Sequence, residues 1–359
     1  MKKQDITTYF NLSFRLGLRQ IVSFSLNNPQ LAWTAARLYL SFRLGEQKRA
    51  RYQRQGVQIP PMIIFSITNN CNLDCVGCYA KVLHHSPEKE LTREQFQDTI
   101  QQASDLGVSV ILLAGGEPFM REGLLDTLDE FPRMIFLLFT NGTLLDDAAI
   151  HQLRRQRNIL PVVSIEGDQQ DTDLRRGGGI YERANEVFNK LKENKVLFGT
   201  SITQTSQNFE LVNDEAYLVD MMEKGCKVFF FINYLPVNME SNELALTPPQ
   251  VLRHLAILEE LRVKYPALFL AFPGGEVELG GCVAGGKGLV HINPLGEVQP
   301  CPFSPYSDAN LKEVSLLEAL QSRHLEIIRN SSERLDESDG YCALWKNREW
   351  VEVLYKNEI

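Results

Sequence analysis

The sequence predicts an α/β protein: a partial barrel of six parallel strands, with a helical extension before it and a small α+β domain after it. Between residues 61 and 270, short apolar runs alternate with longer amphipathic segments. These short runs are apolar throughout, as is typical of parallel strands that are covered on both faces. After about residue 271, glycine pairs and a hairpin pattern replace the alternation, which indicates a second unit.

Composition is ordinary for a globular protein with a large core. The chain has 359 residues, of which 44% are hydrophobic and 23% charged. No apolar run reaches the roughly 20 residues that a membrane-spanning helix needs. Asp5 and Asn11 interrupt the segment where a signal peptide would have its apolar core. We therefore expect a cytoplasmic protein.

Charge is distributed unevenly along the chain, whose net charge is −8. Residues 1–60 contain ten Lys and Arg residues but only Asp5 and Glu46 as acids, so the remainder is strongly acidic. An acidic main body excludes a general nucleic-acid binder, because neutralising phosphates requires a cationic face. The basic segment 1–57 is suited either to peripheral contact with an anionic membrane or to packing on the barrel.

Residues 1–60 form the first predicted unit, a helical N-terminal extension. Apolar residues recur at helical spacing as far as Phe24, and Asn27-Asn28-Pro29 then breaks the pattern. A second helix is expected from Pro29 to Gln53, where apolar positions are interleaved with arginines. The pair Pro60-Pro61 ends the extension.

Residues 61–270 form the second predicted unit, a partial (βα)6 TIM-like barrel. Its expected strands are Met62–Ile67, Val108–Leu113, Ile135–Phe139, Val162–Ile165, Leu197–Ile202 and Val228–Tyr234. The clearest helices are Thr92–Leu106, Leu124–Glu130, Asp146–Arg155, Tyr181–Glu193, Asn213–Lys224 and Pro249–Lys264. In such folds the chemistry lies at the carboxyl ends of the strands, so the residues that follow each strand are candidates for a functional site.

Residues 271–359 form the third and smallest predicted unit. A hairpin is expected from Leu289–Asn293 and Glu297–Pro300, and a helical stretch follows it. Three of the seven cysteines of the chain lie here, at Cys282, Cys301 and Cys342. An odd number of cysteines without an export signal favours metal or cluster binding over disulfides.

The strongest motif is Cys71-Asn72-Leu73-Asp74-Cys75-Val76-Gly77-Cys78-Tyr79, directly after the first predicted strand. Three thiols within eight residues can converge on one metal centre, and thiolates suit an iron–sulfur cluster or zinc. On a four-iron cluster, three cysteines leave one iron open to another ligand. A zinc site would take His84 or His85 as its fourth ligand.

This cysteine spacing, followed by an aromatic residue, resembles the signature of the radical S-adenosylmethionine (AdoMet) superfamily. The second predicted strand ends in Gly115-Gly116-Glu117-Pro118, which resembles the GGEP motif of the same family. The two motifs follow consecutive strands in the family's order. The resemblance implies that Cys71, Cys75 and Cys78 hold a 4Fe-4S cluster and that AdoMet chelates its open iron.

The resemblance further implies an AdoMet-binding set. Gly115, Gly116 and Glu117 are expected to meet the methionine amino group, where absent side chains permit close backbone approach. Tyr79 is expected to flank the adenine. Ser164 and Glu166 resemble the stretch that contacts the ribose in relatives, although Asp is commoner where Glu166 stands.

The cysteines of the third unit resemble the Twitch or SPASM extension of this superfamily. The pattern consists of Cys282, a turn at Gly296 ahead of Cys301, and the distal Cys342, without the crowded cysteines of a full SPASM motif. It implies an auxiliary 4Fe-4S cluster whose fourth ligand is substrate, water or a side chain other than cysteine. The alternative is that these are ordinary buried cysteines.

The resemblance implies an enzyme. A flavodoxin- or ferredoxin-type reductant would supply one electron, AdoMet would be cleaved to methionine and a 5′-deoxyadenosyl radical, and the radical would abstract hydrogen from an organic substrate. We expect a small-molecule, cofactor-precursor or lipid-like substrate, because residues 1–57 look helical, unlike the strand-rich recognition module of many peptide maturases. The alternatives are a peptide-modifying maturase and a non-catalytic iron–sulfur electron carrier or redox sensor.

Overall fold

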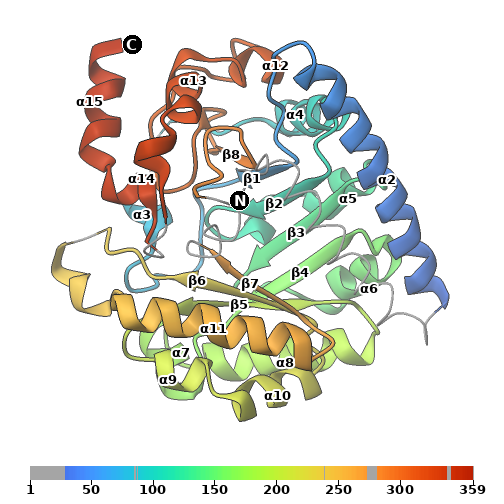
Figure 1. Ribbon diagram of the computed structural model, residues 1–359. Helices are drawn as coiled ribbons and strands as arrows, with labels where there is room; N and C mark the ends of the chain where they lie inside the picture. The colour runs from blue at the N-terminus through green and yellow to red at the C-terminus, as the bar shows by residue number, and fades with distance from the viewer. Residues whose placement is uncertain are drawn as a thin grey trace.

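The computed structural model describes residues 29–84, 86, 88–237, 239–272, 281–337 and 341–358. Within them, the strands form one sheet in the order β7-β6-β5-β4-β3-β2-β1-β8-β9. All neighbours pair in parallel except β9, which is antiparallel to β8. The sheet curls into a half-barrel with helices on its outer side (Figure 1). The strands are β1 Met62–Ser66, β2 Val110–Ala114, β3 Ile135–Thr140, β4 Ile159–Ser164, β5 Gly199–Gln204, β6 Val228–Asn233, β7 Leu268–Phe272, β8 Leu289–Ile292 and β9 Val298–Gln299.

The predicted α/β fold with a partial barrel is confirmed, and each of the six expected strands is present. One strand was missed. The run Leu268–Phe272 follows α11 and adds β7 to the edge of the sheet, beside β6. Its burial does not alternate, and Leu270 is well exposed. An edge strand with one partner lacks the fully buried pattern of its neighbours, and for this reason its apolar run is not recognisable as a buried strand from sequence alone.

The helices follow the predicted βα alternation. Thr92 caps α4 in a reciprocal pair with Gln95, and the Asp146 side chain accepts from the backbone N–H of Ala149 at the start of α6. The longer helices are α2 Pro29–Gln53, α4 Arg93–Leu106, α6 Asp147–Gln156, α7 Gln169–Arg176, α8 Ile180–Glu193, α10 Glu215–Glu223, α11 Pro248–Lys264, α13 Arg323–Asn330 and α15 Arg348–Glu358. The shorter ones are α3 Tyr79–Leu83, α5 Leu124–Asp129, α9 Phe209–Val212, α12 Leu316–Ala319 and α14 Ala343–Lys346.

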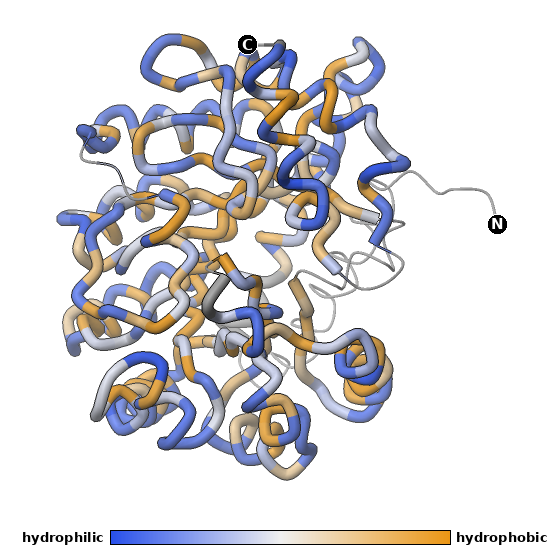
Figure 2. The backbone as a smooth tube through the Cα atoms, turned by 90° about the vertical axis from the view of Figure 1, so that its left-hand side faces the viewer, coloured by the Kyte–Doolittle hydropathy of each residue, from blue (hydrophilic) through white to orange (hydrophobic). Residues whose placement is uncertain are grey.

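The main core lies between the outer face of the sheet and the helices. Phe65 of β1 meets Phe96 of α4 edge to face, with ring centroids 5.2 Å apart. Phe188 of α8 stacks on Phe198, just before β5, at 5.7 Å. Hydrophobic residues gather in the interior, along the strands, in Figure 2. This packing fixes the strand ends on which a site would depend.

The predicted helix Pro29–Gln53 is confirmed as α2, which lies at the right of the view in Figure 1. Buried Phe42 packs with Val110 and Ile135, the first residues of β2 and β3, so α2 covers the end of the barrel opposite the expected site. Arg49 donates to the carbonyl of Gly107 and to Ser109 Oγ. The helix predicted before Pro29 lies outside the described residues.

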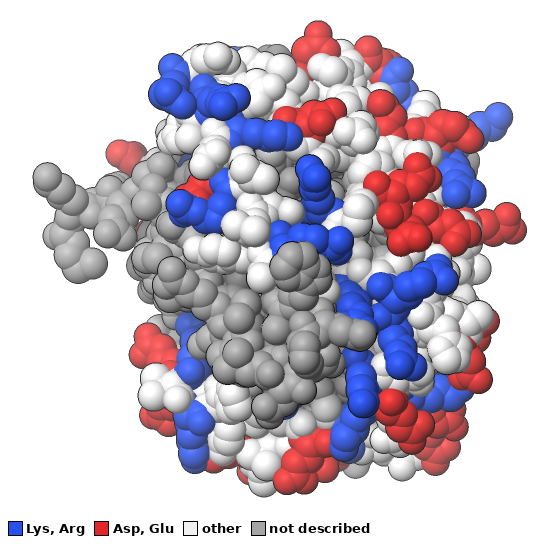
Figure 3. All heavy atoms as spheres, turned by 90° about the vertical axis from the view of Figure 1, so that its right-hand side faces the viewer, with Lys and Arg blue, Asp and Glu red and all other residues white. Residues whose placement is uncertain are grey.

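Membrane contact through residues 1–57 stays a prediction. In the part of the chain that is described, no helix is both long and apolar enough to cross a membrane. The face that carries α2 shows Lys and Arg side chains interspersed with acidic groups (Figure 3). Within α2, Arg43 pairs with Glu46 at 3.0 Å.

The C-terminal part of the chain continues the barrel sheet. The predicted hairpin is present as β8 and β9, and β8 pairs in parallel with β1. The boundary predicted at residue 271 falls within β7. The division of the chain into three units stays a prediction.

The loop after β1 packs closely on the loop after β2. The backbone N–H of Gly116 donates to Thr68 O at 2.7 Å, and that of Glu117 donates to Asn70 O at 2.8 Å. A Cβ at Gly116 would lie 2.0 Å from Asn70 O, and one at Gly115, whose φ is +118°, would lie 2.5 Å from Thr68 O. Only glycine permits this approach. The glycine pair therefore fixes the start of the loop that carries the first three cysteines.

Replacing Gly116 by alanine tests this contact. We expect Gly116→Ala to displace the Thr68–Asn70 backbone, lowering the free energy of unfolding by about 1–3 kcal/mol and reducing iron bound after anaerobic reconstitution. Urea unfolding and iron quantitation measure the two effects. The control is Gly178→Ala, because nothing lies within 4 Å of a Cβ there. Equal behaviour of the two variants would contradict the packing.

Candidate functional site

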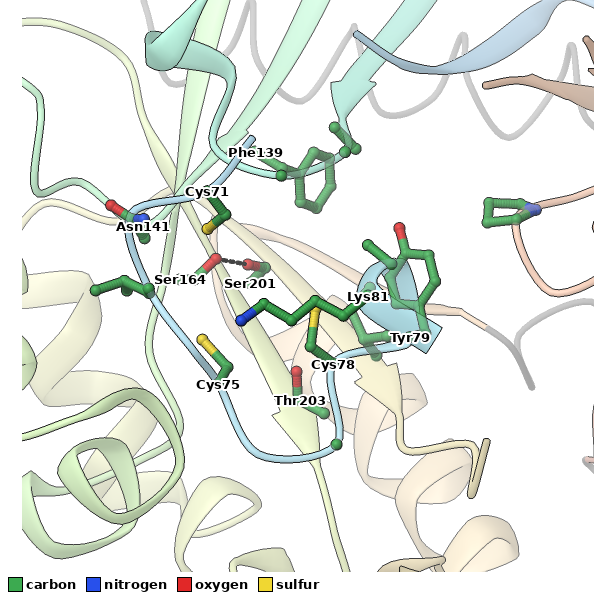
Figure 4. A pocket seen from close by; sticks show the side chains of 18 of the residues that line it. Cys71, Cys75, Cys78, Tyr79, Lys81, Phe139, Asn141, Ser164, Ser201 and Thr203 are labelled. Atoms are coloured by element: carbon green, nitrogen blue, oxygen red, sulfur yellow. Dashed lines mark hydrogen bonds between the residues drawn. The ribbon is translucent and has the colours of Figure 1, made fainter. Parts of the chain in front are cut away.

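A cavity of about 220 Å³ lies at the carboxyl ends of the barrel strands. The loop between β1 and α3 forms one wall, and the sulfur atoms of Cys71, Cys75 and Cys78 point into the space that it encloses (Figure 4). The structure thus brings the three predicted cysteines together at the predicted end of the barrel. Ser164, Ser201 and Thr203 lie across from them, on β4 and β5.

Contacts from separate elements hold this cysteine loop, which we define as residues 69–78. Asn141, after β3, donates from Nδ2 to Asn72 Oδ1 at 2.9 Å. The backbone N–H of Val76 donates to Arg175 O at 2.9 Å, at the end of α7. Gly77, with φ of +66°, leaves room for Tyr234, whose hydroxyl would lie 2.4 Å from a Cβ there. The loop is therefore positioned by tertiary contacts at several points along its length.

The chemistry of the donor set suits an iron–sulfur cluster. Burial raises the pKa of the Cys71 and Cys75 thiols in the metal-free chain, and Arg176 and Arg175 partly oppose this at Cys75. Metal binding would release these protons. Among the described residues, no three His, Cys, Asp or Glu side chains lie close enough to hold a single metal ion. In a four-iron cluster each cysteine binds a different iron.

The zinc alternative needed a histidine ligand. His84 does not line the cavity, and its Nε2 donates to the carbonyl of Pro302 at 2.7 Å. His85 lies outside the described residues. Cys226 is fully buried in the main core, so it is a packing residue rather than part of the site.

The predicted Gly115, Gly116 and Glu117 line the cavity beside the cysteine loop. The Glu117 carboxylate is 1% exposed. Its Oε1 accepts from Thr140 Oγ1 at 2.7 Å and its Oε2 from the Asn141 N–H at 2.8 Å. Burial raises the pKa of Glu117, and these hydrogen bonds oppose that rise. Through Asn141, Glu117 also supports Asn72 of the cysteine loop.

Tyr79 and Ser164, predicted for AdoMet binding, both line the cavity. Ser164 Oγ lies 2.9 Å from Ser201 Oγ, the hydrogen bond drawn in Figure 4. Tyr79 stands at the start of α3, with its ring 5.1 Å from that of Phe303. The roles of these residues toward AdoMet stay predictions.

Glu166, the other residue expected near the ribose, is a buried ion-pair partner. It does not line the cavity and is 1% exposed. Its Oε1 is 2.6 Å from Arg175 Nη1 and 2.6 Å from Arg176 Nη2. Its Oε2 accepts from the backbone N–H of Thr203 at 2.8 Å. The carboxylate joins the ends of β4, β5 and α7, and its contact with a ribose stays a prediction.

Arg175 and Arg176 end α7, pair with Glu166, and both line the cavity. The sequence analysis did not point to two other residues of the cavity, Tyr234 and Phe303. Tyr234 follows β6, a position that the rule on strand ends would have found. Phe303 comes from the C-terminal part, and no pattern in its own segment indicates that it reaches the barrel.

The three C-terminal cysteines lie together in a second place. Cys282, Cys301 and Cys342 are buried in one cluster with apolar residues such as Val283 and Ala343. This cluster borders the first site. Burial is the main cause that raises the pKa of the Tyr79 hydroxyl, and the nearby thiols of Cys78 and Cys301 raise it further.

Glu166→Gln tests the role of the Glu166 carboxylate. The change leaves two largely buried arginines without their counter-charge, so we expect the free energy of unfolding to fall by about 3–5 kcal/mol. Glu210→Gln removes an exposed partner of Arg253, and we expect it to cost less than about 1 kcal/mol. Urea unfolding compares the two. A Glu166→Gln variant of unchanged stability that binds AdoMet poorly would instead support a direct ligand role.

Comparisons with known proteins agree with this geometry. Residues 65–215 match the model of the radical SAM superfamily. The chain is 24% identical over 315 residues to the AdoMet-dependent heme synthase of Methanosarcina barkeri, covering 80% of this chain and 89% of that protein. It is 26% identical over 260 residues to the antilisterial bacteriocin subtilosin biosynthesis protein AlbA of Bacillus subtilis, covering 69% and 56%.

A solved structure shares the fold. Streptococcus suis SuiB, bound to its precursor peptide SuiA, matches with a TM-score of 0.63 at 18% identity, covering 86% of this chain and 73% of that one. The matched segment 65–215 contains the cysteine loop, the glycine pair and the ends of β1 to β5. Residues 65–215 therefore form a radical SAM domain, and the chain is an enzyme built on it.

Proposed function

We propose that this chain cleaves AdoMet reductively and abstracts hydrogen from a small-molecule, cofactor-precursor or lipid-like substrate. The observation that carries the proposal is the cavity in which Cys71, Cys75 and Cys78 face Gly115–Glu117 and Ser164. When bound there, a 4Fe-4S cluster supplies the electron that breaks the carbon–sulfur bond of AdoMet, giving methionine and a 5′-deoxyadenosyl radical. An external flavodoxin- or ferredoxin-type reductant is the proposed electron source.

The residues of the chain would hold and orient AdoMet. Gly115 and Gly116 expose backbone beside the cysteines, which suits the amino acid part of AdoMet. Ser164 and Ser201 offer paired hydroxyls across the cavity for the ribose, and the Tyr79 ring offers an apolar face for the adenine. The apolar walls keep water from a reactive radical.

The cavity favours an apolar substrate. Its wall is largely apolar. Five strands contribute Ile64, Leu112, Phe139, Ile232 and Phe272, and loops contribute Leu235 and Phe303. Pockets for small molecules and cofactors typically combine such walls with a few polar groups. The similarity to an AdoMet-dependent heme synthase supports a cofactor precursor. The similarity to AlbA supports the alternative, a peptide-modifying maturase.

The C-terminal cysteines complete the proposal. We propose that Cys282, Cys301 and Cys342 bind an auxiliary 4Fe-4S cluster, because all three are buried in one cluster of the C-terminal part. Tyr79, next to Cys78 in the sequence, packs against Phe303 of this cluster, with ring centroids 5.1 Å apart. That proximity suits an electron acceptor for the substrate radical.

AdoMet cleavage is the direct test. Protein reconstituted anaerobically with iron and sulfide, reduced and mixed with AdoMet, is expected to form 5′-deoxyadenosine, measured by chromatography. Cys75→Ala should abolish the product, whereas the core variant Cys226→Ala should retain it. If wild-type protein forms no more product than Cys75→Ala, the chain is a non-catalytic iron–sulfur carrier or redox sensor instead.

Substrate class has its own test. We expect an iron porphyrin to raise the rate of 5′-deoxyadenosine formation above the substrate-free rate, because its apolar face suits the wall formed by Phe139, Phe272 and Phe303. A panel of unmodified peptides is assayed in parallel under the same conditions. Stimulation by a peptide, with a mass change in that peptide and no response to the porphyrin, would favour the maturase.

A further inference from the structure

The auxiliary cysteines are held next to a buried carboxylate. The backbone N–H of Cys282 donates to Leu335 O at 2.9 Å. Gly281, with φ of +118°, lets this segment approach the Leu335 segment closely, since a Cβ on Gly281 would lie 2.7 Å from the same Leu335 oxygen. Gly285 N–H donates to Pro300 O at 3.1 Å, beside Cys301. The segments that carry Cys282, Cys301 and Leu335 are thus tied together by their backbones.

Glu337 brings its carboxylate into this place from the segment after Leu335. It is 1% exposed, and its Oε1 accepts from the N–H of Ala343, next to Cys342, at 2.8 Å. One contact therefore joins Glu337 to the Cys342 side of the cluster, and Leu335 joins the same segment to Cys282. Residues 335–337 therefore contact the backbone at Cys282 and next to Cys342.

The surroundings of Glu337 are apolar. The cluster around the cysteines contains Val283, Leu335, Ala343 and Leu344, all almost completely buried. A buried carboxylate beside buried thiols is of the kind that can coordinate a metal. Burial raises the pKa of the neighbouring Cys282 thiol most strongly, and the negative charge of Glu337 is the next largest cause.

We propose that Glu337 is the fourth protein ligand of the metal centre on Cys282, Cys301 and Cys342. This inference rests on the proposed auxiliary cluster. Three thiolates occupy three irons of a four-iron cluster, and a carboxylate oxygen on the fourth would close the cluster to substrate. Such a centre would transfer electrons rather than anchor the substrate.

The competing explanation is that Glu337 is structural: it accepts the Ala343 N–H and so shapes the turn before α14. Glutamine separates the two explanations, because its amide oxygen still accepts that hydrogen bond but is a poor iron ligand. Glu337→Cys does the opposite: it supplies a good iron ligand but lacks the side-chain oxygen that accepts the hydrogen bond. Glu333→Gln is the matched control, because Glu333 lies on the same segment and is exposed.

The experiment uses full-length protein in which Cys71, Cys75 and Cys78 are replaced by alanine, so that only the auxiliary cluster binds iron. This parent is expected to hold about four irons per chain after anaerobic reconstitution. Iron retention against a chelator, the electron paramagnetic resonance spectrum and the midpoint potential are measured. We expect Glu337→Gln to retain iron more than about tenfold less tightly than the parent and Glu337→Cys to retain it with an altered spectrum. Glu333→Gln should match the parent.

Two results would overturn the inference. One is a Glu337→Gln protein with the iron retention, spectrum and potential of its parent. The other is a parent without iron, which would remove the auxiliary centre itself. Neither result bears on AdoMet cleavage, which is measured separately as 5′-deoxyadenosine formed by wild-type protein and lost in Cys75→Ala. Failure of the inference and failure of the proposed function are therefore distinguishable.

Discussion

The close approach of the Gly115-Gly116 backbone to the Thr68–Asn70 backbone is the constraint on which the cavity depends. Two strands that are neighbours in the sheet end in loops, and these loops can bond to each other only if no Cβ stands between them. The contact fixes where the cysteine loop begins. Asn141, Arg175 and Tyr234 then hold the loop further along, so four barrel elements share the task of positioning three thiols.

Two buried carboxylates support this arrangement in different ways. Glu117 accepts hydrogen bonds from Thr140 and Asn141, and Asn141 in turn holds the cysteine loop. Glu166 pairs with two arginines at the end of α7, and the carbonyl of Arg175 accepts from Val76 of the loop. Glu117 thus positions the cysteine loop through Asn141, and Glu166 positions it through Arg175. Motif residues of this kind can be essential without touching a ligand.

Sheet topology brings the two sets of cysteines together. Because β8 pairs with β1, the hairpin that leads to Cys301 lies beside the strand that leads to Cys71. Tyr79, which follows Cys78, packs against Phe303, which is buried with the C-terminal cysteines, at a centroid distance of 5.1 Å. Residues more than 200 positions apart in sequence therefore share one wall of the cavity. An electron route between two clusters would need just such proximity.

The sequence by itself determined the βα alternation, the six central strands, the Pro29–Gln53 helix and the cysteine and glycine motifs at strand ends. These features are local, since periodicity and spacing depend on residues close together along the chain. Tertiary structure alone decided that β7 and β8 extend the sheet, that Glu166 turns to Arg175 and Arg176, and that Phe303 reaches the barrel. The physical reason is that edge pairing and buried ion pairs are contacts between distant segments, whose partners no local pattern specifies.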